Sequence, residues 1–202
     1  MTRVTAAVTP KGERRRYALV RAAAELLCEG GFEAVRHRAV ADRAGIPRAS
    51  TTYYFSSLDE LVGNAVEYLG AAEVVALRTS VKEIPRRRRG AEAAADVLVE
   101  LLAAETTREQ LISRYERYIA CARYPGLRGV ERQLLQQRLD AVAEAMARSG
   151  RLARPDMMAA LLYAVEGAVL STLVNDDGEP RGSVRDTLVD VIDVLAPIDQ
   201  RI

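Results

Sequence analysis

The sequence contains no tryptophan, one histidine and two cysteines, and this scarcity argues against several kinds of site. His37 and the distant Cys28 and Cys121 cannot supply the four ligands of a usual zinc site, so we expect no metal. A Ser-His-Asp triad would have to use His37, which stands between two arginines, and the sequence has no glycine-rich phosphate loop. We therefore expect no catalytic residues, no cofactor and no enzymatic activity.

Long apolar runs are also lacking. No stretch reaches the length of a membrane span, and the start, MTRVTAAVTPKGERRRY, lacks the apolar core of a signal peptide. We expect a cytoplasmic protein that does not enter a membrane. Cys28 and Cys121 both fall in helical, apolar settings, and we expect them to be reduced structural thiols rather than a disulfide.

The abundant residues favour helices. Hydrophobic residues make up 49% of the chain and charged residues 28%, whereas aromatic residues make up only 5%. Alanine, leucine, arginine and glutamate are common and no segment alternates as a strand would, so we predict an all-α fold of about nine helices. After a first helix that stops at Gly30-Gly31, the expected helices cover about 37–44, 48–54, 58–80, 91–104, 108–123, 127–149, 156–174 and 184–195.

Charge is unevenly distributed along the chain. Residues 1–58 hold ten Lys or Arg and five Asp or Glu, a net charge of +5, so the remaining residues carry −4 of the overall +1. A basic N-terminal quarter on a mildly acidic body indicates a local anion-binding face. The run Arg86–Arg89 lies outside this quarter, and we interpret it as a solvated linker.

Two short predicted helices, 37–44 and 48–54, are joined by a tight turn at Gly45. Glycine tolerates the left-handed backbone of a sharp turn, and the small Ala41 would let the two helices cross closely, as in a helix-turn-helix. The second helix is rich in groups that hydrogen-bond phosphates and base edges, which predicts entry into a DNA major groove. The candidate DNA-binding residues are His37, Arg38, Arg48, Ser50, Thr51, Thr52, Tyr53 and Tyr54.

Three consecutive segments, ALVRAAAELLCEGGFEAV, RAVADRAGIPRASTTYYF and SSLDELV, resemble the N-terminal domain of the tetracycline-repressor (TetR) family of bacterial transcription regulators. The resemblance implies a DNA-binding domain followed by a helical ligand-binding and dimerising domain. We expect a flexible arm over 1–12, a helix-turn-helix domain over 13–56, and an effector-binding and dimerisation domain over 57–202. Two positions depart from the family pattern: Thr52 replaces a usual tyrosine, and Leu58 replaces a lysine that often contacts phosphate.

The predicted second domain combines tyrosines and a few charged groups with apolar helices, which are the ingredients of a small-molecule pocket. The same residues also suit an ordinary core whose hydroxyls are satisfied. The candidate effector-binding residues are Tyr115, Tyr118, Ile119, Ala122, Tyr163 and Glu166. The last two helices have wide apolar faces, which predicts an interface, and in the resembling family these helices pair across a two-fold axis.

These patterns together predict a homodimeric repressor that binds a palindromic operator in double-stranded DNA and is released by a small-molecule effector. An activator of the same fold is one alternative. A small all-α ligand-binding protein or enzyme that uses the C-terminal pocket is another, although that half offers no evident acid–base pair or metal set.

Overall fold

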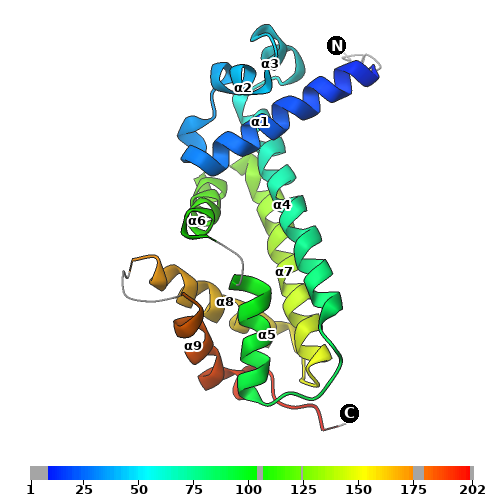
Figure 1. The fold of residues 1–202 in the computed structure, drawn as a ribbon, viewed down its shortest axis with the longest axis vertical. Helices are drawn as coiled ribbons and strands as arrows, with labels where there is room; N and C mark the ends of the chain where they lie inside the picture. Colours follow the sequence, from blue (N-terminus) through cyan, green and yellow to red (C-terminus); the bar gives the residue numbers. More distant parts are fainter. Residues whose placement is uncertain (1–8, 104–106, 124, 175–179, 201–202) are drawn as a thin grey trace. The chain divides into compact units, whose positions relative to one another are not determined.

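The computed structural model describes residues 9–103, 107–123, 125–174 and 180–200, and these residues form an all-α fold, as predicted (Figure 1). The only strand-like pairing among them is an isolated bridge between Arg151 and Ile198. The elements are α1 (Pro10–Ala34), α2 (His37–Ala44), α3 (Ala49–Tyr54), α4 (Leu58–Glu83), α5 (Ala91–Ala103), α6 (Arg108–Arg123), the 3₁₀ turn η1 (Pro125–Leu127), α7 (Arg128–Arg148), α8 (Pro155–Thr172) and α9 (Pro180–Leu195).

The chain divides into two compact units that do not follow the order of the sequence. The first unit contains the described residues up to Ala71 together with Glu109–Glu131, and the second contains Ala72–Arg108 and the residues from Arg132 onward. Helices α4 and α7 therefore contribute to both units. The first unit extends past residue 56, where the sequence analysis set the limit of the DNA-binding domain. That limit stays a prediction.

Helix α1 begins earlier than the sequence analysis expected. The Thr9 side chain accepts a hydrogen bond from the Gly12 backbone N–H at 3.2 Å, and Pro10 occupies the first turn, where its missing N–H has no cost. Residues 9–12 are thus structured, which corrects that part of the expected arm, whereas residues 1–8 lie outside the described residues. The predicted stop at Gly30-Gly31 is a kink within α1, since Gly31 has φ 63°.

The core of the first unit joins α1, α2, α4 and α6 through small and aliphatic side chains. Its fully or almost fully buried members include Leu19, Val40, Phe55, Leu61 and Cys121. The start of α4 is fixed by Ser57, whose hydroxyl accepts a hydrogen bond from the Glu60 N–H at 3.1 Å. In this unit α2 packs on α1, and α3 packs on α2.

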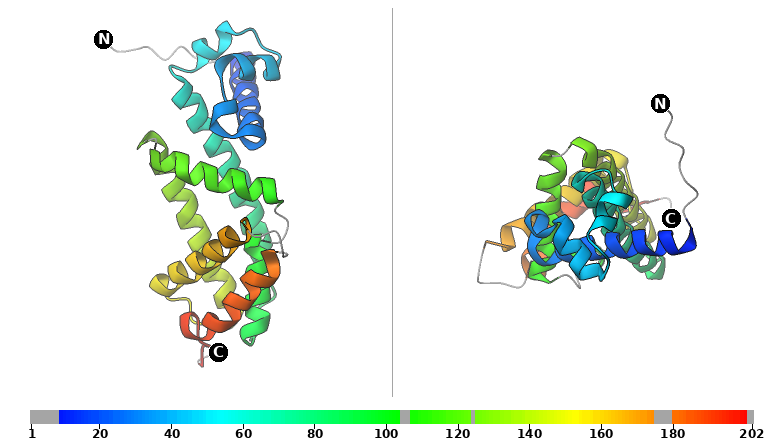
Figure 2. Two further views of the ribbon diagram at one scale, coloured as in Figure 1. Left: turned by 90° about the vertical axis from the view of Figure 1, so that its left-hand side faces the viewer. Right: turned by 90° about the horizontal axis from the view of Figure 1, so that it is seen from above.

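The second unit is built around α5, α8 and α9, which pack on one another and lie together in both views (Figures 1 and 2). The fully or almost fully buried side chains of α8 and α9 include Met158, Leu162, Val165, Leu188 and Ile192. No helix in the described part of the chain is long and apolar enough to cross a membrane.

Buried arginines tie together one end of the second unit. Arg89 is 5% exposed and its guanidinium donates to the Pro85 carbonyl at 3.0 Å, so interpreting the whole run as a solvated linker was wrong for this residue. Arg151 is 2% exposed and donates to the Ala196 carbonyl at 2.7 Å and to Asp193 at 2.8 Å. The Arg89 backbone N–H donates to the Ser149 carbonyl at 3.1 Å and so attaches the loop before α5 to the end of α7, and Arg151 attaches the segment after α9 to the same end.

Candidate nucleic-acid interface

The turn between α2 and α3 has the geometry that the sequence predicted. Gly45 has φ 64° and ψ 32°, and the Ile46 N–H donates to the Ala41 carbonyl at 3.0 Å, which closes the C-terminus of α2. Val40 and Ala41 are completely buried, so the small side chain at 41 does allow a close crossing. The turn therefore fixes the angle at which α3 leaves α2.

One side of α3 faces the interior of the first unit. Thr51 is 0% exposed, and its hydroxyl donates to the Arg48 carbonyl at 2.8 Å. The prediction that Thr51 contacts DNA is therefore wrong, because its side chain anchors α3 instead. Phe55, which follows the helix, is 1% exposed, as expected for a core residue.

The opposite side of α3 is exposed and polar. Tyr53 is 79% exposed, and its ring stacks edge-on against the half-buried Tyr54 with centroids 5.0 Å apart. The Arg48 side chain is 57% exposed and touches Asp42 only at 3.5 Å, while Thr52 is exposed and Ser50 half-buried. This face presents a cation, hydroxyls and a phenol, which are the groups that bind phosphates and base edges.

The start of α2 adds two of the predicted residues to the same segment. Arg38 is exposed and lies 3.7 Å from Asp42. His37 is half-buried, and its Nδ1 atom is buried without a hydrogen-bond partner among the described residues. A role of either residue in DNA binding stays a prediction.

Arg16 has a structural role that the sequence analysis did not find. Its guanidinium lies over the Phe55 ring, 5.1 Å from the centroid, and donates to the Asn64 side-chain oxygen at 2.8 Å. Leu58, at the position where the family often has lysine, packs against the core of the first unit. No local pattern indicates the Arg16 contact, because 48 residues separate the partners in the sequence.

The predicted effector residues fall in both units. Tyr115 and Tyr118 of α6 are half-buried, with ring centroids 6.0 Å apart, but Ile119 is 56% exposed and Ala122 is also exposed. On α8, Tyr163 is 55% exposed and Glu166 is half-buried. Their role as a shared effector site stays a prediction.

Glu166 belongs to a charged cluster that the sequence did not reveal. Arg138 of α7 is 6% exposed and reaches Glu166 at 3.5 Å and Glu73 of α4 at 3.2 Å. All three residues lie in the second unit. The sequence analysis did not single out Arg138, because the periodic pattern of α7 gives no sign that an arginine is buried there.

The two cysteines are free thiols in different surroundings. Cys28 is exposed, which corrects the expected apolar setting, whereas Cys121 is buried. Burial, with a smaller contribution from the Glu131 carboxylate, raises the pKa of Cys121 to about 11. Among the described residues, no group of three or more His, Cys, Asp or Glu is arranged to hold a metal ion.

Two protein-family models match this chain. Residues 19–65 match the model for bacterial regulatory proteins of the tetR family, and residues 89–194 match the model for the tetracyclin repressor-like C-terminal domain. The chain belongs to the TetR family. It is a DNA-binding transcriptional regulator, and the first match contains the whole of α2 and α3.

Several solved structures share the fold of this chain. SCO7518 of Streptomyces coelicolor A3(2), named as a transcriptional regulator, is 23% identical with a TM-score of 0.70 over 88% of this chain and 98% of its own. The multidrug binding protein EbrR in complex with proflavin is 29% identical, with a TM-score of 0.66 over 88% of this chain and 99% of its own. A TetR transcription regulator of Haloarcula marismortui is 18% identical, with a TM-score of 0.71 over 91% of this chain and 99% of its own. No match was found among curated proteins.

Proposed function

We propose that this TetR-family regulator is a homodimeric repressor that binds a palindromic operator through α3 and acts in the cytoplasm. The observation that carries the proposal is the two-sided character of α3. Thr51 and Phe55 anchor the helix, while Arg48, Thr52 and Tyr53 remain exposed on a rigid support. A short helix with this division can enter the major groove without loss of core packing. The proposed DNA-binding domain covers 13–56, and residues 57–202 are proposed to bind effector and partner.

The second protomer is proposed to pack on α8 and α9. These helices leave apolar side chains in water, since Leu170 is 49% exposed and Val194 is 77% exposed. Burial of apolar surface of this kind favours association by about 25 cal/mol for each Å². A two-fold dimer presents two copies of α3 to a palindrome whose half-sites lie about one helical turn apart, or a multiple of it.

A small-molecule effector is proposed to bind within residues 57–202, and the residues that the sequence analysis selected on α6 and on α8 stay candidates for its contacts. EbrR, with 29% and 26% identity in its proflavin and ethidium complexes, supports a small-molecule role for this family fold. The effector acts by a population shift: it must bind better to the protein conformation that holds the two α3 helices at the wrong spacing. In this scheme the regulator performs no chemical reaction on its ligand.

Binding to the DNA upstream of the protein's own gene tests the DNA-binding role. Arg48→Ala is expected to relax preference at particular base pairs by about 1–3 kcal/mol, whereas Tyr53→Phe weakens binding to all sequences alike. Arg86→Ala serves as the control, since Arg86 is exposed and lies outside the proposed interface. Equal affinity of the wild-type protein for this DNA and for unrelated DNA at physiological salt would reject the proposal.

The dimer is tested by light scattering on the double variant Leu170→Glu, Val194→Glu. We expect the wild-type protein to have the mass of a dimer and the double variant that of a monomer, because charges are not tolerated in an apolar interface. Val75→Glu is the matched control, since Val75 is 66% exposed on α4 and outside the proposed interface. A monomeric wild-type protein would contradict this part of the proposal.

The direction of control is measured with a reporter gene placed behind the operator. A repressor lowers expression until the effector is added. Expression that rises when the protein is supplied would identify an activator instead. A DNA affinity that does not change with salt would point to the ligand-binding alternative, because phosphate contacts release counterions and make log K fall with log salt.

A further inference from the structure

The first unit contains a cavity of about 400 Å³ that is separate from α3 and from the predicted effector residues. Its walls come from the end of α1, the first two turns of α4 and the 3₁₀ turn η1, and all of its lining residues belong to the first unit. The volume falls within the range of small-molecule sites. The cavity is therefore large enough to be considered as a second binding site in the same unit as the helix-turn-helix.

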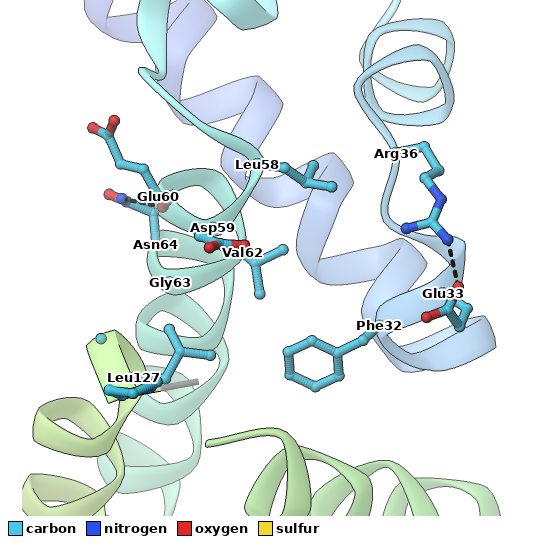
Figure 3. A pocket seen from close by; sticks show the side chains of 12 residues that line it. Phe32, Glu33, Arg36, Leu58, Asp59, Glu60, Val62, Gly63, Asn64 and Leu127 are labelled. Carbon is cyan, nitrogen blue, oxygen red and sulfur yellow. Dashed lines mark hydrogen bonds and ion pairs between the residues drawn. The ribbon is translucent and has the colours of Figure 1, made fainter. Parts of the chain in front are cut away.

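The inner surface of the cavity is apolar. Phe32 points from α1 toward Leu58 and Val62 of α4, and Leu127 of η1 lies below them (Figure 3). Val62 and Leu127 are buried, whereas Phe32 and Leu58 are only half-buried because they border the open space. The kink at Gly31 turns the chain at the end of α1, directly before Phe32. An apolar body of one or two rings matches these walls.

The rim of the cavity is acidic. Glu33, Asp59 and Glu60 line it, and Arg36 is the one basic lining residue. Arg36 is paired with Glu33, so this ion pair contributes no net charge. The lining residues therefore carry a net charge of −2 when all are ionised.

The two remaining carboxylates differ in availability. Glu60 accepts hydrogen bonds from the Ser56 hydroxyl and N–H at 2.6 and 2.7 Å, and it projects away from Phe32 (Figure 3). Asp59 is exposed and has no hydrogen bond or ion pair within the described residues. Asp59 is thus the carboxylate that can accept a cation without loss of an existing contact.

We propose that this cavity is a binding site for a small organic cation with an apolar body, such as an aromatic amine in its ammonium form. The apolar walls bury the body, and the acidic rim, with Asp59 as the principal contact, attracts the charge. The N-terminus of α4 lies at this cavity and would by itself favour an anion. Asp59 and Glu60 already occupy this positive helix end, so the rim repels an anion of the same size. The site is independent of the proposed effector site.

The test uses three probes of one size and different charge: 1-naphthylmethylammonium, 1-naphthalenemethanol and 1-naphthoate. Each is titrated into the full-length protein with ¹³C-labelled methyl groups, and the shifts of Leu58, Val62 and Leu127 give a Kd at the cavity itself. We expect the cation to bind two- to fivefold more tightly than the alcohol, the size of one exposed charge contact, and naphthoate to bind weakest. Equal binding of all three probes, preference for the anion, or no shift at these methyl groups would overturn the proposal.

Substitutions at the rim test whether its carboxylates cause the preference for a cation. Asp59→Asn should weaken binding of the cation by about two- to fivefold and leave the alcohol unchanged. Glu67→Gln, an exposed position on the same helix outside the cavity, is the control and should change neither. Leu58→Lys places a like charge beside the bound cation and should weaken binding of the cation at least about tenfold. If Asp59→Asn and Leu58→Lys both leave the cation's Kd unchanged, the assigned site is wrong.

Failure of the cavity proposal can be distinguished from failure of the DNA-binding proposal. The probe titrations need no DNA, so failure of operator binding leaves their result intact. Glu166→Gln, in the second unit, should not alter the shifts of the three cavity methyl groups. A Glu166→Gln variant that abolishes these shifts would show that they report binding elsewhere, and would reject the cavity site.

Discussion

The helix-turn-helix segment and the second unit differ in the burial of their arginines. Between Pro10 and Tyr54, every ion pair that the structure shows joins side chains that remain partly exposed, such as Arg43 with Glu29 and Arg48 with Asp42. In the second unit, Arg89, Arg138 and Arg151 are buried and bond to groups far away in the sequence.

Exposed and buried arginine ion pairs suit different roles. Exposed pairs are weak and readily exchanged, so the basic side chains near α3 can leave their carboxylates for phosphates. Buried arginines are costly to separate from their partners, so they hold helices in one arrangement. The four predictions below compare the two regions, from the largest expected effect to the smallest.

Loss of a buried arginine should have the largest effect. Arg138→Met leaves Glu73 and Glu166 close together without their shared cation, and we expect a loss of about 3 kcal/mol in the free energy of unfolding. Urea denaturation measures it. Addition of Glu166→Gln to this variant should restore part of the loss, because one of the two carboxylates is then neutral. A loss under about 0.5 kcal/mol would mean that the cluster does not hold the second unit.

Strain at the turn should come second. Gly45→Ala places a Cβ at φ 64°, and although nothing lies within 4 Å of that atom, the left-handed backbone should cost about 1–2 kcal/mol. Gly126→Ala is the matched control, since its Cβ also meets nothing and its φ is not positive. Thermal unfolding of both variants gives the comparison. Equal stability of the two variants would show that the turn is not under this constraint.

The two threonines of α3 should separate stability from DNA binding. Thr51→Val removes the buried hydroxyl that donates to Arg48, at a cost of about 1 kcal/mol, and should leave operator preference unchanged. Thr52→Val removes an exposed hydroxyl, so we expect little change in stability and a weaker interaction with the operator. The reverse pattern would show that the assignment of the two faces of α3 is wrong.

An exposed pair should have the smallest effect, with a clear pH signature. Hydrogen bonds from Arg43 lower the pKa of Glu29 below its ordinary value of 4.5. Because the pKa is lowered in the folded state, the pair stabilises the fold above the unfolded-state pKa, and the effect is lost as pH falls through the lowered pKa. Glu29→Gln should therefore melt slightly below wild type at pH 7 and equal to it in acid.

Local patterns made much of the first unit predictable. Gly45 and Ala41 indicated the turn, the repeated apolar positions indicated the helices, and the shared motif led to the TetR family, which the comparisons confirmed. Thr51 was assigned wrongly because a threonine on a polar helix gives no sign of which side faces the core. That information lies in how α3 packs within the first unit, not in the six residues of the helix.

Long-range contacts were not predictable from one sequence. Arg138 and Glu73 are 65 residues apart, and Arg151 and Asp193 are 42 apart, so no spacing rule connects them. The grouping of α6 with the first unit has no local signature either, since α6 follows α5 in the chain. The cavity beside Phe32 likewise depends on η1, which is short and has no periodic signature.

Binding of the full-length protein to a palindrome selected from randomised DNA tests the central claim most directly. Fluorescence anisotropy at physiological salt should give a Kd at least about 10³-fold lower for the selected palindrome than for a scrambled duplex of equal length. Arg48→Ala should reduce this ratio, and Thr51→Val should not. A ratio near one for the wild-type protein, or the same ratio for wild type and Arg48→Ala, would contradict the account of α3 as the helix that reads DNA.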